Sequence, residues 1–164
     1  MNSKSFIFFI LIIAMTGCAS TAIPLGNGTD LSGHPVCLTS CDQIPAVIEK
    51  YKIGHDLDTE ESEIDYLFYR IRSSNVKFIR NGLEANGSSA SEFLRWKIGW
   101  YEKAFGEKIN TDENFVGKVL SGSQKTGKPY VIVLEDGTKH NMQPIMRNEL
   151  NYLNSINSQP HSKS

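Results

Sequence analysis

The sequence has few of the features that identify a chemical task. It contains 3 cysteines among 164 residues and no C-x-x-C redox motif. Its 17 Lys and Arg nearly balance its 18 Asp and Glu, which excludes a long-range attraction to nucleic acid. The longest apolar run, residues 6–15, would cover about 15 Å as a helix, well short of a bilayer core of about 30 Å. We therefore expect neither a nucleic-acid partner nor a membrane-spanning helix.

The amino terminus instead has the pattern of a cleaved export signal. Lys4 supplies a positive charge, residues 6–15 form the apolar segment, and Gly17 precedes Cys18. This pattern resembles the lipobox of bacterial lipoprotein precursors, although Met15 stands where Leu is usual. The resemblance implies cleavage before Cys18 and its acylation; two or three acyl chains anchor a protein stably, where a single chain is marginal. The alternative is an ordinary signal peptide with Cys18 merely near the cleavage site.

The residue after Cys18 bears on location. Ala19 stands where an Asp often retains lipoproteins in the inner membrane. We therefore expect a protein that is lipid-anchored on the periplasmic face of the outer membrane, with the membrane as its partner through Cys18.

The remaining chain is long enough for one domain. Removal of residues 1–17 leaves 147 residues with 16 basic and 18 acidic side chains, because Lys4 is the only charge lost. Residues 18–42 are rich in Ser, Thr, Gly, Asn and Pro without hydrophobic periodicity, which predicts a flexible tether. We expect a single domain over residues 43–154 and a disordered tail over residues 155–164.

Cys37 and Cys41 form a C-x3-C pair. Residues four apart in a turn lie near disulfide range, and an exported protein meets an oxidising compartment, so the pair is a disulfide candidate. A metal site that includes His34 is the alternative. It would have three candidate ligands, whereas structural zinc usually takes four. We expect no metal and no cofactor.

Hydrophobic periodicity and turn signals predict an α+β fold, with about four helices packed around a small antiparallel sheet. Asp42, Asp58 with Glu61, and Ser89 with Glu92 are the expected helix caps. The predicted helices cover residues 43–51, 59–73, 90–105, a shorter segment after Thr111, and a final segment from Pro144. The predicted strands cover residues 76–80, 83–85, 130–134 and 138–140, with Asn81-Gly82 as the strongest turn signal.

The helix over residues 90–105 is apolar on two sides. Leu94 and Tyr101 share one face at helical spacing, whereas Trp96 and Trp100 fall nearly opposite. We expect both tryptophans to be buried within the domain, because exposed tryptophans are uncommon in soluble monomers. The alternative is that they face a partner groove or the membrane interface.

The order of motifs from Glu63 to Leu153 is recognisable. These motifs are Phe78–Gly82, Ser89, Phe93–Lys97, Phe115, Ser121–Ser123, Thr126–Tyr130 and Glu149–Leu150. In this order they resemble the YfeK-like family of small bacterial periplasmic proteins of unknown function. The resemblance covers about 90 residues and implies a small α+β fold in the envelope. It brings no established activity.

Three cations of these motifs are candidate contacts. Arg80, Arg95 and Lys128 would form a site for a carboxylate or a peptidoglycan group, or would pair with acidic residues such as Asp65. We expect structural pairing, because surface ions commonly pair. Trp96 and Trp100 complete the set of possible ligand or partner contacts.

The sequence contains none of the complete motifs that we considered as indications of an enzyme. Residues 122–128 match G-x4-G-K, but Pro129 follows the lysine, and a helix precedes the segment where a phosphate loop needs a strand. No G-x-S-x-G motif accompanies a pairing of His140 with Ser121 or Ser123. We therefore expect no catalytic residues and a non-catalytic binding or interaction module, with an envelope protein or peptidoglycan as its partner. An inhibitor or immunity protein against an envelope-acting hydrolase is an alternative, and so is a peptidoglycan-binding lipoprotein.

Overall fold

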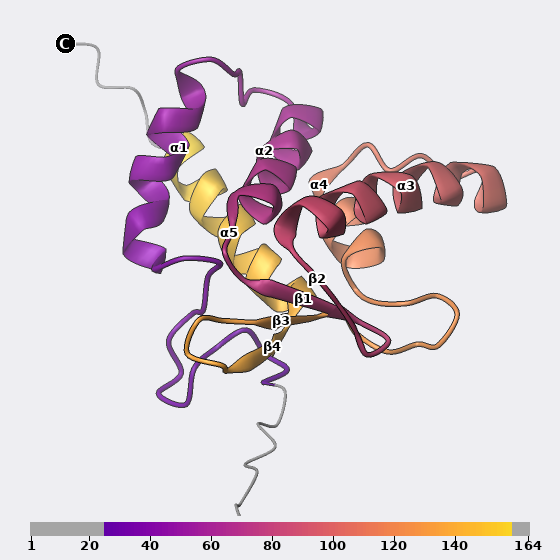
Figure 1. Cartoon of the computed structure of the whole chain (residues 1–164). Coiled ribbons are helices and arrows are strands. Elements are labelled where there is room, and N and C mark those ends of the chain that lie inside the picture. The colour runs from indigo at the N-terminus through magenta and orange to yellow at the C-terminus, as the bar shows by residue number, and fades with distance from the viewer. Residues whose placement is uncertain (1–24, 159–164) are drawn as a thin grey trace, which may run out of the picture.

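The computed structural model describes residues 25–158 of the chain (Figure 1). The export signal and Cys18 lie outside this range. Within it the fold is α+β, with five α-helices and one four-stranded sheet. The helices are α1 (Ile44–Lys52), α2 (Glu60–Ser73), α3 (Gly87–Phe105), α4 (Asp112–Asn114) and α5 (Met142–Asn157). A 3-10 turn, η1 (Cys41–Gln43), precedes α1, and a π-helical turn, η2 (Phe115–Val119), follows α4.

The sheet is antiparallel throughout, in the order β2-β1-β3-β4. Its strands are β1 (Lys77–Arg80), β2 (Leu83–Ala85), β3 (Val131–Val133) and β4 (Lys139–Asn141). Both predicted hairpins form, and β3 is an internal strand. Asn81 and Gly82 turn between β1 and β2 with φ of 52° and 85°, as a tight hairpin turn requires. Figure 1 shows the helices gathered on one side of this sheet.

Three helices begin differently from the sequence expectation. The N-cap of α1 is Gln43, without a side-chain cap hydrogen bond, whereas Asp42 was expected in this role. The cap of α2 is Thr59, which exchanges hydrogen bonds with Ser62 in a capping box, whereas Asp58 and Glu61 were expected in these roles. The cap of α3 is Asn86, whose Oδ1 accepts from the backbone amide of Ser89 at 2.9 Å, so the helix starts earlier than predicted. The longer α3 brings its first turn against the end of α2.

Residues 25–42 are packed on the domain, although they were expected to belong to a flexible tether. Leu25 pairs with β4 through a parallel bridge to His140. The amide of Leu38 donates to Glu149 Oε1 at 2.8 Å, and the Leu38 side chain is buried. Composition gave no sign of this contact, because the partner of Leu38 is 111 residues away in α5.

A buried ion pair joins α2, α5 and this amino-terminal segment. Arg70 Nε donates to Glu149 Oε2 at 2.8 Å, and the same guanidinium reaches Thr39 Oγ1 at 2.9 Å. Both side chains of the pair are buried, so their charges are satisfied by each other rather than by water. Among residues 25–158 no helix is both long and apolar enough to cross a bilayer.

Candidate functional site: the aromatic face of α3

The outer side of α3 carries an aromatic face, defined here as Phe93, Trp96 and Trp100. Trp96 is 60% exposed, and Phe93 and Trp100 are partly buried, so the expected burial of the tryptophans is wrong for Trp96 and incomplete for Trp100. The rings of Phe93 and Trp96 lie 5.6 Å apart. The opposite side of the helix fills the core, and among residues 25–158 no element covers Trp96.

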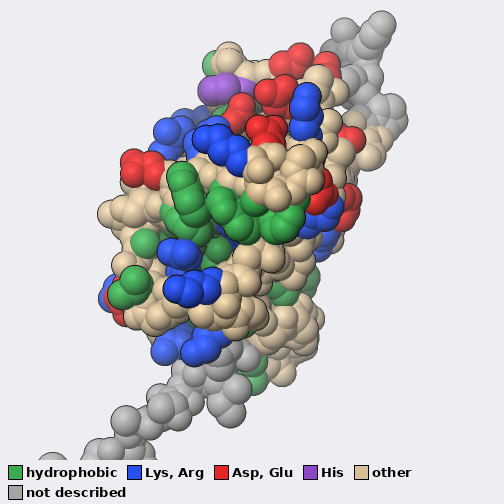
Figure 2. Space-filling model, turned by 90° about the vertical axis from the view of Figure 1, so that its right-hand side faces the viewer, with side chains coloured by type: hydrophobic (Ala, Val, Ile, Leu, Met, Phe, Trp, Pro, Cys, Tyr) green, Lys and Arg blue, Asp and Glu red, His purple; other side chains and the backbone are tan. Residues whose placement is uncertain are grey.

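The aromatic face is continuous with other apolar surface. Phe105, at the end of α3, is also 60% exposed, and its ring meets that of Trp100 edge-on at 5.2 Å. Figure 2 shows a band of hydrophobic side chains across this side of the molecule, with Lys and Arg side chains above and below it. Large exposed aromatic groups of this kind are typical of interaction surfaces.

Two loops from distant parts of the sequence meet beside this face. Asn81 Nδ2 donates to Ser123 Oγ at 3.2 Å, and Thr126 Oγ1 donates to Asn81 Oδ1 at 2.7 Å. The β1–β2 turn is thereby fixed to the loop over residues 121–130. These are the segments that carry the resemblance described above, and the fold brings them to one place.

Arg80 connects the turn to the aromatic face. Its guanidinium lies 4.1 Å from the centroid of the Phe93 ring, and it is exposed. Tyr130 packs edge-on against the same ring at 6.0 Å. The expected pairing of Arg80 with an acidic side chain does not occur among the described residues. Lys128 is exposed on the adjacent loop.

Arg95 has a different role from Arg80. It faces α2, where its Nη2 donates to Asp65 Oδ1 at 3.0 Å and its guanidinium stacks over Phe68 at 4.1 Å. The pairing with Asp65 considered from the sequence is therefore present. The three candidate cations divide between two surfaces, so a single cluster of Arg80, Arg95 and Lys128 does not form.

Lys97 is a member of the site that sequence reasoning missed. Its side chain is buried, and Nζ donates to the carbonyl oxygens of Val119 and Gly122, each at 2.7 Å. The ammonium group thus satisfies backbone acceptors after the η2 turn. Burial, with a further contribution from the charge of Arg80, lowers the pKa of Lys97 to about 8. Nothing local in the sequence marks it, because its acceptors lie more than twenty residues away.

A pocket of about 170 Å³ lies between the sheet and the first half of α3. Its wall is mainly apolar, with the guanidinium of Arg80 and the hydroxyl of Ser89 among its polar groups. The wall residues are Phe78, Ile79, Arg80, Leu83, Glu84, Ala85, Ser89, Ala90, Phe93, Leu94, Tyr130 and Met142.

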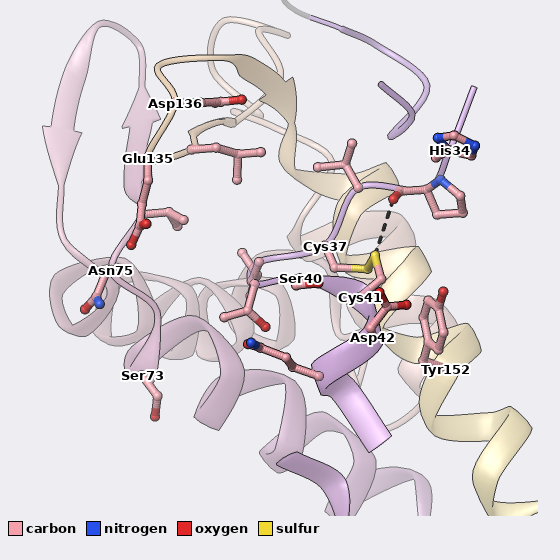
Figure 3. Close-up of a pocket in the computed structure, with 17 residues that line it drawn as sticks. His34, Cys37, Ser40, Cys41, Asp42, Ser73, Asn75, Glu135, Asp136 and Tyr152 are labelled. Atoms are coloured by element: carbon pink, nitrogen blue, oxygen red, sulfur yellow. Dashed lines mark hydrogen bonds between the residues drawn. A yellow bond between two sulfur atoms is a disulfide. The ribbon is translucent and has the colours of Figure 1, made fainter. Parts of the chain in front are cut away.

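A larger, open groove of about 870 Å³ lies on another side of the domain (Figure 3). It is framed by residues 34–43, by Ser73, Asn75 and Val76 where α2 ends and β1 approaches, and by the β3–β4 turn. The disulfide between Cys37 and Cys41, with a Cα–Cα distance of 5.4 Å, forms part of its wall. His34 lies in the groove but pairs with Asp30 at 3.4 Å rather than with either sulfur.

Asp136, one of the acidic groups of this groove, holds the local turn. Asp136 accepts hydrogen bonds from the amide and the hydroxyl of Thr138, which hold the pKa of its carboxyl below the usual range. Figure 3 shows Glu135 and Asp136 on the opposite side of the groove from Asp42. Within residues 25–158 no group of three or more His, Cys, Asp or Glu side chains is arranged for a metal ion.

His140 lies in β4, apart from both serines considered with it. Its side chain is buried, which lowers its pKa, and Nε2 lies 3.3 Å from Thr138 Oγ1. The hydroxyl of Ser121 donates to the Lys118 carbonyl, and that of Ser123 accepts from Asn81. The structure does not assemble these side chains into a nucleophile and base.

Comparison with known proteins identifies the family of this chain. A model of the family of unknown function DUF5329 matches residues 58–154. The chain belongs to this family. It is also 36% identical over 72 residues to the uncharacterized protein YfeK of Salmonella typhimurium strain LT2. That match covers 43% of this chain and 57% of the relative. No solved structure matches the chain.

The range that matches DUF5329 contains the whole aromatic face and every wall residue of the 170 Å³ pocket. The 870 Å³ groove takes one wall from residues 34–43, which lie before that range. The aromatic face is therefore the surface built entirely from the DUF5329 domain.

Proposed function

We propose that this chain is a lipid-anchored, non-catalytic binding protein of the bacterial envelope, and that the aromatic face of α3 is its binding surface. The observation that carries the proposal is Trp96, a large aromatic side chain that is 60% exposed and lies next to Phe93, over whose ring Arg80 is placed. Tryptophan and arginine are the residues on which binding energy most often concentrates at interfaces. The partner is an envelope protein or peptidoglycan; an inhibitor of an envelope-acting hydrolase is one form of the first.

The anchor follows from the sequence pattern that ends at Cys18. If Cys18 is acylated, six residues, 19–24, separate it from Leu25, the first residue that the structure describes. Fully extended, that length spans about 25 Å. The domain then stays near the outer membrane, where envelope proteins and the wall lie within its reach.

Replacement of Cys18 tests the anchor separately from the binding surface. A Cys18→Ser variant is expected to leave the detergent-rich phase in Triton X-114 partition of whole cells, whereas the wild-type protein enters it. Metabolic labelling with an alkyne fatty acid should mark the wild-type protein alone. Equal partition of the two proteins would contradict lipid anchoring.

Replacement of Trp96 tests the binding surface. Trp96→Ala is compared with Ile53→Ala, which also removes an exposed apolar side chain, 86% exposed beyond the end of α1. Affinity purification from detergent-solubilised envelope and retention on purified peptidoglycan are measured for both. Truncation of a central tryptophan costs about 2 kcal/mol or more, so Trp96→Ala should lose at least about tenfold in binding. Ile53→Ala should bind as the wild type does.

The two measurements separate the partners. A stoichiometric protein recovered by wild type and Ile53→Ala but lost in Trp96→Ala supports a protein partner. Retention on peptidoglycan with the same dependence supports the wall. Equal binding of both variants, or no binding in either measurement, would overturn the proposal.

A further inference from the structure

The 170 Å³ pocket beneath α3 has a buried apolar floor and an exposed mouth. Phe78, Leu94 and Met142 are buried and form its inner wall. Leu83 and Arg80 line the same pocket but are exposed, so they stand at its mouth. A ligand would therefore meet an arginine first and apolar side chains behind it.

The volume of the pocket, about 170 Å³, limits the size of the group that can enter it. An apolar cavity of about 150 Å³ holds a group the size of benzene. Sites for whole drug-sized ligands are larger, at about 300–1,000 Å³. The pocket thus fits the end group of a ligand, with the remainder left outside over the exposed surface of α3.

The charge around the mouth is positive. Arg80 is the cation of the pocket wall, and Lys97, which is buried and outside that wall, lies near enough for the charge of Arg80 to lower its pKa. Glu84, the carboxylate in the pocket wall, is paired with Lys77 at 3.2 Å. Among residues 25–158 neither Arg80 nor Lys97 has an acidic partner within salt-bridge distance. An anionic group at the mouth would therefore meet the guanidinium of Arg80, whose charge no carboxylate neutralises.

The strand beside the pocket favours a peptide over other anions. β2 is an edge strand of the sheet, and Leu83, Glu84 and Ala85 line the pocket from it. On its outer side β2 pairs with no strand in the described part of the chain. An open edge of this kind binds an extended peptide through main-chain hydrogen bonds, while a neighbouring pocket takes a side chain.

We propose that this pocket binds the free C-terminal carboxylate of a peptide that ends in a small apolar residue. The carboxylate pairs with the guanidinium of Arg80, and the last side chain enters the apolar floor beside Phe78 and Leu94. The preceding residues run along the edge of β2 and the aromatic face. This inference rests on the proposed function, since it specifies the chemistry that the binding surface recognises. Protein C-termini and the D-alanine ends of wall stem peptides both have this chemistry.

Five probes test the inference on the folded protein. Two are fluorescent: a Gly-Ser-Val-Ala peptide with a free carboxylate and the same peptide as its carboxamide. Three are competitors: unlabelled Gly-Ser-Val-Ala, diacetyl-Lys-D-Ala-D-Ala and butyrate. Fluorescence polarisation gives the affinities. A hydrogen-bonded ion pair contributes about 1.5–3 kcal/mol, so the acid should bind at least about tenfold more tightly than the amide.

Arg80→Gln and Arg95→Gln form the matched pair of variants. Arg80→Gln should abolish the preference for the acid. Arg95→Gln should keep it, because Arg95 lies on the side of α3 that faces α2 and pairs with Asp65. Both arginines are exposed, so neither change removes a core side chain. Stronger competition by the D-alanine peptide than by unlabelled Gly-Ser-Val-Ala assigns the ligand to the wall, and the reverse assigns it to a protein C-terminus.

Three results would overturn the inference. They are equal affinity for acid and amide, an acid preference that survives Arg80→Gln, and competition by butyrate as strong as that by the peptide. If one of these occurs while envelope or wall binding still depends on Trp96, the pocket inference fails and the proposed function stands. If the Trp96 dependence is also missing, both fail.

Discussion

Two ion pairs show that burial decides how strongly the loss of one charge affects stability. Arg95 and Asp65 are both about half exposed, and water screens their attraction. Arg70 and Glu149 have lost nearly all contact with water, so each depends on the other and on its hydrogen bonds to Thr39 and Leu38. Removal of one buried charge leaves its partner uncompensated, whereas removal of an exposed charge does not.

We expect Glu149→Gln to lower the free energy of unfolding by about 3–5 kcal/mol, because Arg70 would stay buried without its counter-ion. Asp65→Asn should cost less than about 1 kcal/mol, because water solvates Arg95. Urea titrations with an unchanged m-value provide the measurement. Replacement of both Arg70 and Glu149 by Met should recover much of the loss. Equal stability of Glu149→Gln and Asp65→Asn would show that the buried pair is no more important than the exposed one.

At the scale of the element, α3 is fixed at its first turn and open along its outer side. Gly87 lies so close to α2 that an added Cβ would clash with the carbonyl oxygen of Ile71. At Gly99, in the same helix, an added Cβ meets nothing within 4 Å. The two glycines therefore serve different purposes: Gly87 permits a close helix contact, and Gly99 has no steric requirement.

Substitution by alanine should act in opposite directions at these two positions. Gly87→Ala is expected to destabilise the protein by more than about 1 kcal/mol, because backbone must move to relieve the clash. Gly99→Ala should stabilise it by about 0.5–1 kcal/mol through helix propensity. Thermal unfolding followed by circular dichroism measures both changes. A gain in stability for Gly87→Ala would mean that α2 and α3 do not meet as described.

At the scale of the whole molecule, the amino-terminal segment, residues 25–42, packs against the domain although it precedes the residues that match DUF5329. Asn148 of α5 donates through Nδ2 to the carbonyl oxygens of Gly28 and Val36, at 2.9 and 2.8 Å. The Cys37–Cys41 disulfide lies next to these contacts and closes a short loop. The segment therefore adds to a domain whose α2, α3, sheet and most of α5 lie within residues 58–154.

Replacement of Cys37 and Cys41 together by Ser should reduce the free energy of unfolding by about 2 kcal/mol, the loop-closure value for a loop of about five residues. The far-UV circular dichroism spectrum should stay unchanged, because the disulfide holds none of the strands. Hydrogen exchange at the Leu38 amide should become faster. Loss of the folded spectrum in the double variant would contradict this division of the molecule.

Much of the fold is determined by local sequence. Asn81-Gly82 sets the β1–β2 turn because the turn needs positive φ at both residues. The apolar spacing of α2, α3 and α5 places those helices to within a few residues. The expected outlines of the strands also hold, because alternation and turn residues act over short distances.

The site and its context depended on contacts between distant residues. Arg70 and Glu149 are 79 positions apart in the sequence, and the carbonyl groups that accept from Lys97 are 22 and 25 positions away from it. The exposure of Trp96 depends on whether another element covers α3, and the packing of residues 25–42 depends on α5. Periodicity reports which residues share a face of a helix, but only tertiary structure decides what lies against that face. The sequence by itself determined the elements and the pattern ending at Cys18; the tertiary structure placed Arg80, Phe93 and Tyr130 around one pocket and left Trp96 exposed next to Phe93.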